Sequence, residues 1–226
     1  MFNVRYVLLS PHHTNEQSRR LLNQTYESWK KTFNQVLGSA DAHLELDDFF
    51  RYDMIGVLLQ GDSIIGSHYY SLFNLELDCC LDHHYMDDIY QETRDKLKAA
   101  GHKSIYSLEY TNIVPEWRKR SMANIRWVDV LIGCALKFLD ESPEDGIIGT
   151  PRIDIKMDET TSRMGALTIQ PPVKKMNYEC AVIYWPKLSD RKLYSPELQR
   201  LVDSIWSKHE DFLMPKPEAQ PVKKIA

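Results

Sequence analysis

Hydrophobic residues follow two different spacings along this chain, and the spacing predicts where strands and helices lie. Short stretches dense in Val, Ile, Leu and Tyr predict strands. These stretches are residues 2–9, 54–60, 63–75, 105–114 and 178–185, with a further strand within 147–157. Apolar positions three and four residues apart predict helices. The predicted helices cover residues 15–37, 85–100, 122–139 and 158–167, followed by an amphipathic helix after Ser195.

Polar residues and glycines mark several element ends. Thr14 has Gln17 three residues later, which is the spacing of a capping box, so we expect Thr14 to begin the first helix. Gly38 is expected to end this helix as its C′ residue. Gly61 and Asp62 stand between two predicted strands, and a two-residue turn with Gly first is a strong hairpin signal.

The order of elements is strand, helix, hairpin, helix, strand, helix, strand, helix, strand, which predicts an α/β layered domain with a mixed sheet. The expected organisation is a main domain over residues 1–186 and a helical extension over 187–213. The tail over 214–226 has three prolines and alternating charges, so we expect it to be disordered.

Charge and cysteine content narrow the class of protein. The 226 residues carry 28 Lys and Arg against 32 Asp and Glu, and the net charge of −4 disfavours a general nucleic-acid binder. Four cysteines are too few for a disulfide scaffold, so a reducing, cytoplasmic setting is expected. The first ten residues lack the pattern of a signal peptide. No apolar stretch approaches the ~18 residues that indicate a membrane span.

The segment 109–123 carries the clearest chemistry. Its sequence is E-Y-T-N-I-V-P-E-W-R-K-R-S-M-A, in which a strand ends at Pro115 and a basic turn opens into a predicted helix. Unpaired N–H groups and the helix dipole favour an anion at a helix start. The positive charges nearby are Arg118, Lys119, Arg120 and Arg126. The segment therefore predicts a pyrophosphate site; the alternative is a solvated helix start.

This segment resembles the pattern V-x-P-E-Y-R-x-x-G-x-G/A of the GNAT superfamily of acyl-CoA-dependent N-acyltransferases. The matching residues are Ile113, Pro115, Glu116, Trp117, Arg118, Ser121 and Ala123. Ser121 stands where the family has its first glycine, and a serine fits this turn without strain only if its φ is negative. The order of elements over residues 2–186 agrees with the resemblance, and Met164-Gly165-Ala166 resembles the end of the family's fourth helix.

The resemblance implies a three-layer fold with a mixed, mostly antiparallel sheet and helices on both faces. Two parallel strands would splay to hold acyl-CoA or acetyl-CoA, with strand amides on the pantetheine and turn amides on the pyrophosphate. The implied donor-binding residues are Thr111, Asn112, Ile113, Val114, Arg118, Lys119, Arg120, Ser121, Met122 and Ala123. No metal is implied.

The resemblance also implies a catalytic role for Glu109, which lies four residues before Ile113, where many members carry a general base. An ammonium nucleophile must lose a proton before it attacks a thioester, and a backbone N–H would stabilise the oxyanion. The alternative is an ordinary charged residue on a strand. Many members supply a tyrosine from the fourth helix as general acid, but the helix over 158–167 has none, which leaves the acid unassigned.

Three functions are open at this point. The first is acyl transfer from acyl-CoA to a small-molecule amine. The second is a catalytically degenerate binding or regulatory module, suggested by Ser121 and by the missing tyrosine. The third is an acyl synthase whose donor is an acyl carrier protein docked on the basic turn. The length of 226 residues is similar to that of acyl-homoserine-lactone and N-acyl amino acid synthases with this fold.

Two further loop interpretations concern metal and acceptor binding. The loop over 78–84 contains Cys79, Cys80, His83 and His84. Adjacent pairs of this kind match structural zinc patterns poorly, so no metal site is expected. We expect the acceptor pocket to be built from this loop and from the loops over 11–14 and 39–49.

Overall fold

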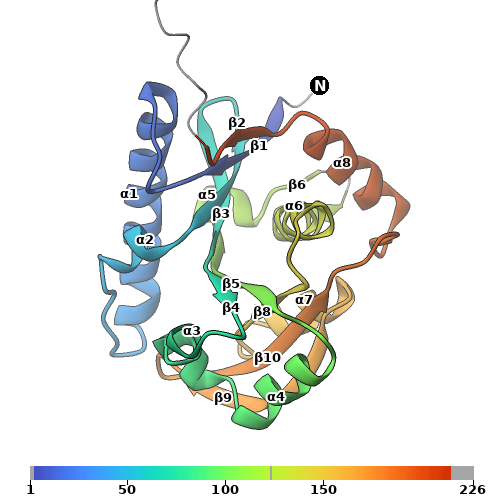
Figure 1. The fold of residues 1–226 in the computed structure, drawn as a ribbon. Helices are drawn as coiled ribbons and strands as arrows, with labels where there is room; N and C mark the ends of the chain where they lie inside the picture. Colours follow the sequence, from blue (N-terminus) through green and yellow to red (C-terminus); the bar gives the residue numbers. More distant parts are fainter. Residues whose placement is uncertain (1–2, 123, 215–226) are drawn as a thin grey trace, which may run out of the picture.

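A mixed, nine-stranded sheet runs through the middle of the molecule (Figure 1). The computed structural model describes residues 3–122 and 124–214. The strand order is β11–β1–β2–β3–β5–β8–β10–β9, with β4 beside β5, and neighbours are antiparallel except at β1–β11 and β5–β8. The strands are β1 (Val4–Leu9), β2 (Met54–Gln60), β3 (Ser63–Tyr70), β4 (Leu72–Asn74), β5 (Ser104–Ile113), β8 (Gly146–Gly149), β9 (Leu167–Lys175), β10 (Tyr178–Pro186) and β11 (Glu210–Phe212).

Helices cover both faces of this sheet (Figure 1). On one face lie α6 (Trp127–Glu141) and α8 (Pro196–Trp206), and on the other lies α1 (Glu16–Gly38). Beyond α1, the same face is covered by α3 (Asp78–Leu81), the 3₁₀ helix η1 (His84–Asp88) and α4 (Gln91–Ala99). The shorter elements are α2 (Asp48–Arg51), α5 (Pro115–Arg118), α7 (Met157–Arg163) and a small hairpin of β6 (Ser121–Met122) and β7 (Ile125–Arg126).

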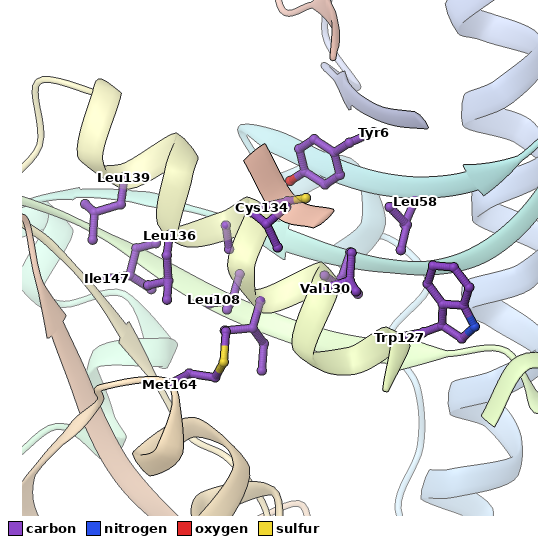
Figure 2. Packing of buried hydrophobic residues seen from close by; sticks show 14 of the residues in the cluster. Tyr6, Leu58, Leu108, Trp127, Val130, Cys134, Leu136, Leu139, Ile147 and Met164 are labelled. Atoms are coloured by element: carbon purple, nitrogen blue, oxygen red, sulfur yellow. The ribbon is translucent and has the colours of Figure 1, made fainter. Parts of the chain in front are cut away.

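The strong alternation of side chains along the strands divides the core between these two faces. Tyr6 and Leu8 of β1 pack towards α6 and α8, whereas Val7 and Leu9 pack towards Trp29 of α1. Helix α6 is apolar on most sides because it is sandwiched between the sheet and α8, as Figure 2 shows for its side chains beside those of the strands. Burial of this kind contributes about 1.5–3 kcal/mol for each large side chain.

The local geometry confirms one of the three predicted element boundaries and corrects the other two. The hairpin at Gly61 is confirmed: Gln60 pairs with Ser63, and Gly61 has a φ of 57°. The capping box of α1 lies one residue later than predicted, because the side chain of Asn15 accepts from the Ser18 N–H and the Ser18 hydroxyl pairs with the Asn15 N–H. Gly38 does not take a left-handed conformation; it is the last residue of the helix.

The parallel strands β5 and β8 separate partway along their length. They pair from Ile105 opposite Gly146 to Leu108 opposite Gly149, where β8 ends. Strand β5 continues to Ile113 and pairs only with β3 on its other side. The register shifts near Tyr110, whose φ of 45° marks a bulge in β5. The splay predicted from the GNAT resemblance is therefore present.

Several predicted elements need correction. The helix expected to open at residue 122 begins at Trp127, because the β6–β7 hairpin intervenes. The helix expected over 85–100 is divided into η1 and α4, and the strand over 63–75 into β3 and β4. Strands β9 and β11 were not predicted. The tail over 215–226 and Ala123 lie outside the described residues.

The C-terminal amphipathic helix is confirmed as α8, and it packs closely on α6. A methyl group on Gly133 of α6 would lie 2.6 Å from Val202 of α8, and Trp206 donates to Glu141 at 2.6 Å. Among the residues that the structure describes, none of the helices has the length and apolar content that crossing a membrane requires.

Candidate active site

A cleft of about 160 Å³ lies where β5 and β8 separate. Its floor is formed by the β5 residues Leu108 to Thr111 and by Gly149 at the end of β8. The cleft reaches from Ile132 on α6 to Phe33 on α1, so it connects the two faces of the sheet between the separated strands.

Glu109 provides a carboxylate to the lining of this cleft. It is half-buried, and one of its oxygens accepts a hydrogen bond of 2.7 Å from the Ser107 hydroxyl. Burial raises the pKa of Glu109, while the Lys175 ammonium and the Ser107 hydrogen bond oppose that rise. A carboxylate whose pKa is raised is a stronger proton acceptor than an ordinary surface glutamate.

Apolar and aromatic side chains form most of the cleft wall. They come from the last turns of α1, from the segment after β8, and from the β9–β10 hairpin. The principal members are Phe33, Val36, Leu37, Ile155, Met157, Met176, Tyr178 and Trp185. This wall suits a hydrocarbon chain or an apolar part of a substrate. The loops over 11–14, 39–49 and 78–84 do not line it, so the predicted source of the pocket is wrong for this cleft.

The tip of the β9–β10 hairpin is fastened to the end of α1. Met176 and Asn177 both have positive φ (49° and 64°), which is the pattern of a type I′ turn. The Asn177 amide donates to the Ala40 carbonyl at 2.9 Å, and the Tyr178 hydroxyl donates to the Val36 carbonyl at 2.8 Å. These bonds join the hairpin to the last turn of α1 and to the residue two positions after it, and the Val36 carbonyl is one of those that a helix end leaves free.

The strand edge predicted to bind pantetheine borders the cleft only in part. The Val114 N–H points to β3, where it donates to Ile65, so alternation directs the main chain of Ile113 away from β3. The Ile113 carbonyl already accepts a 2.8 Å hydrogen bond from Arg118 Nε. Thr111 lines the cleft, whereas the Asn112 side chain is buried and donates to Ser67.

The basic turn presents three exposed cations, Arg118, Lys119 and Arg120, on the surface after α5. The Arg120 guanidinium lies 4.9 Å from the centre of the Trp117 ring. Ser121 is not among the residues with positive φ, which here falls on Asn124 at 64°. The serine therefore fits its backbone without the strain that a left-handed glycine position would impose. The predicted direct entry of this turn into a helix is wrong.

At the start of α6, one buried aspartate is surrounded by two arginines and a tyrosine, a cluster that the sequence pattern did not predict. Asp129 has a side chain only 1% exposed and accepts two hydrogen bonds from Arg126, at 2.7 and 3.0 Å. The Tyr194 hydroxyl donates to Asp129 at 2.9 Å, and Arg163 lies 3.5 Å away. Arg126 was expected to offer a free charge to a phosphate; instead it is paired with Asp129.

The short helix α7 contains no tyrosine that could act as a general acid. Tyr110 and Tyr178 line the cleft from other elements, but Tyr178 donates to Val36 and Tyr110 lies 3.4 Å from Asp48. Cys180 also lines the cleft, and burial raises the pKa of its thiol to about 11. Within the described ranges, no group of three or more His, Cys, Asp or Glu side chains is arranged to hold a metal ion.

Comparisons with known proteins find the fold but no sequence relative. No protein-family model and no curated protein matches the chain. The structure of BjaI, a CoA-dependent acyl-homoserine lactone synthase solved with SAM and isopentyl-CoA, is similar at a TM-score of 0.58 and 11% identity over 92% of each chain.

Two other solved structures extend the likeness. FeeM, an N-acyl amino acid synthase from uncultured soil microbes, gives a TM-score of 0.53 at 13% identity, covering 80% of this chain and 88% of FeeM. NAA60 of Arabidopsis thaliana in complex with acetyl-CoA gives 0.52 at 9% identity, over 81% of this chain and 99% of NAA60. The predicted GNAT fold is thus confirmed, with its mixed, mostly antiparallel sheet and its splayed parallel strands.

Proposed function

We propose that this protein is an acyltransferase that moves an acyl group from acyl-CoA to a small-molecule amine. The carrying observation is the cleft at the β5–β8 splay, which holds Glu109 among apolar walls. Two structures with this fold, BjaI and NAA60, were solved with isopentyl-CoA and acetyl-CoA respectively. The fold is therefore compatible with a CoA thioester, and the apolar wall supports an acyl chain longer than acetyl.

In the proposed reaction, Glu109 accepts a proton from the acceptor ammonium. The amine nitrogen then attacks the thioester carbonyl carbon, so that a C–N bond forms and the C–S bond breaks. As the amide forms, its nitrogen gives up its remaining extra proton, and the departing coenzyme A thiolate takes up that proton by way of water, because no acid is assigned. Transfer of the ammonium proton to a positioned base contributes about 10²–10⁴-fold to such rates.

The donor would lie along the end of β5 and the turn that follows. Main-chain groups near Thr111 and Ile113 would meet the pantetheine, and residues 118–123 would hold the pyrophosphate. The proposed donor-binding set is Thr111, Asn112, Ile113, Val114, Arg118, Lys119, Arg120, Ser121, Met122 and Ala123. Arg118 would keep its bond to the Ile113 carbonyl through Nε and offer its two terminal nitrogens to a phosphate.

An acyl carrier protein is a second candidate donor. The observation that favours it is the exposed run of Arg118, Lys119 and Arg120, whose charge suits an acidic partner as well as a pyrophosphate. Both donors present the same phosphopantetheine thioester, so the roles in the cleft are unchanged. Both donors occur in the cytoplasm, so the proposal places this protein there as well.

Titration calorimetry with CoA, acetyl-CoA and a long-chain acyl-CoA tests the proposal. We expect micromolar binding, tightest for the long chain, and weaker binding in the Arg118→Ala/Arg120→Ala double variant. Arg200, an exposed cation on α8, supplies the control variant Arg200→Ala. Equal binding by both variants would show that the turn does not hold the donor. If none of the three compounds binds, titration with an acyl carrier protein decides between the second donor and a catalytically degenerate module.

A further inference from the structure

Lys175 brings a buried positive charge into the same cleft as Glu109. It is the last residue of β9, opposite Tyr178 in the hairpin, and it lines the cleft. Its Nζ atom exposes less than 1 Å² and has no hydrogen-bond partner of acceptable geometry. The closest charge is Asp88 Oδ2 of η1, at 3.1 Å, and the Tyr85 ring centre lies 4.0 Å away. Asp88 and the ring therefore hold the ammonium in place.

The groups around Glu109 are otherwise acidic or neutral. Asp48 of α2 adds a like charge, and the neighbouring phenols are those of Tyr52 just after α2, Tyr85 of η1 and Tyr110, the next residue of β5. The cleft has a second cation in Arg152, but two nitrogens of its guanidinium are hydrogen-bonded to the two oxygens of Asp154, whereas the Lys175 ammonium has an ion pair with Asp88 and no hydrogen bond. Among the described residues of the cleft wall, Lys175 is thus the cation available to compensate Glu109.

We propose that Lys175 is a positioning residue that keeps the Glu109 carboxylate charged inside the apolar cleft, with Asp88 fixing the ammonium. A buried carboxylate without a counter-charge takes up a proton. A protonated Glu109 could not accept the ammonium proton of an amine. The charge balance of the cleft therefore depends on a residue of β9, a strand that lies outside the segment 109–123 with the acyltransferase-like motif.

This inference deepens the proposed function, since it concerns the base of that reaction. Its physical part can be measured without any substrate. Glu residues labelled with ¹³C at the carboxyl carbon report each side-chain titration by NMR, and the Glu109 signal is identified by its absence in Glu109→Gln. The variant Lys175→Gln removes the charge, and Lys175→Arg keeps it.

We expect the Glu109 titration midpoint to move to higher pH in Lys175→Gln and to stay near that of the wild type in Lys175→Arg. The matched control is Lys174→Gln, because Lys174 is the exposed neighbour on the same strand. The same loss of charge there should leave the midpoint unchanged. In a transfer assay, the activity of Lys175→Gln should fall about tenfold at pH 7 and recover at higher pH, without a matching change in KM.

The outcomes separate the two claims. An unchanged Glu109 midpoint in Lys175→Gln, or an equal change in Lys174→Gln, overturns the role of Lys175. If Lys175→Gln fails to fold, Asp88→Asn tests the same arrangement, because it releases the ammonium without removing it, and an unchanged midpoint there also overturns the proposal. A midpoint that moves as expected in a protein without transfer activity supports the role of Lys175 and counts against the proposed function alone.

Discussion

Asp129 and Glu109 are two carboxylates of the same layered core, and they differ in their burial and in the groups that donate hydrogen bonds to them. Asp129 accepts hydrogen bonds from Arg126 and Tyr194, and its side chain is almost fully buried. Glu109 accepts a hydrogen bond from the Ser107 hydroxyl and faces a cleft. The satisfied carboxylate joins α6, α7 and the C-terminal segment, whereas the other keeps acceptor capacity for an incoming group. Under the proposed function, stability and chemistry reside in different carboxylates.

The largest expected effect comes from Glu109→Gln. This change keeps the shape of the side chain and removes its basicity, so the proposed transfer should slow by about 10²–10⁴-fold. The activity of the wild type should rise as the pH passes through the raised pKa of Glu109, because only the ionised carboxylate accepts a proton. Steady-state rates from pH 5 to 9 measure both effects. A variant that retains full activity would remove Glu109 from the chemistry.

Asp129→Asn should produce the opposite pattern. It leaves Arg126 and Arg163 without their shared counter-charge, and a hydrogen bond to a charged group is worth about 1.5–3 kcal/mol. We expect a loss of about 2 kcal/mol in unfolding free energy, which lowers Tm by about 4–8 °C.

The control for Asp129→Asn is Glu197→Gln, which breaks an exposed ion pair with Arg200 on α8. Such pairs contribute about 0–1 kcal/mol, so its Tm should hardly move. Denaturant titration of both variants makes the comparison. Equal stabilities would contradict the structural role of Asp129.

Tyr194→Phe should have a smaller effect on the same cluster. It removes the 2.9 Å hydrogen bond to Asp129 and leaves the aromatic ring beside Arg163. The expected cost is about 1 kcal/mol. Thermal unfolding of Tyr194→Phe and of the double variant with Asp129→Asn measures whether the two losses couple. Strictly additive losses would show that Tyr194 acts elsewhere.

The smallest expected effect is a gain in stability for Glu109→Gln. Burial raises the pKa of Glu109 above its ordinary value of 4.5, so folding favours the protonated form. That contribution is fully present below the ordinary value and is lost as the pH rises through the raised one. Glu109→Gln should therefore unfold at a higher temperature than the wild type at pH 8, and the gap should vanish near pH 4. A gap that is independent of pH would contradict this account.

The sequence predicts the central strands well because their patterns are local. The hairpin at Gly61 and the strand that ends at Pro115 are both confirmed, since turn chemistry and strand propensity coincide there. Strand β9 escapes prediction because Pro171 and Pro172 interrupt it, and prolines are tolerated only because β9 lies at the edge of the sheet.

The sequence predicts the candidate site only where its residues lie close together along the chain. Glu109 and the basic turn lie in one continuous segment, so the resemblance covers them. Lys175 and Asp88 come from elements that are distant in the sequence, and neither stands in a recognisable motif. Asp129 likewise reads as an ordinary acidic residue in a first helical turn. Its partner Tyr194 is 65 residues away, so the cluster exists only in the folded chain.

The pairing of β11 with β1 has a consequence for synthesis on the ribosome. Val7 pairs with Glu210 and Leu9 with Phe212, so the outer edge of β1 has no partner until residues 210–212 have been synthesised. Translation at about 5–20 residues per second leaves this edge exposed for roughly 10–40 s. An unpaired strand edge is a template for intermolecular pairing. Nascent chains that stall before residue 210 should therefore depend most on chaperones that shield the first strand.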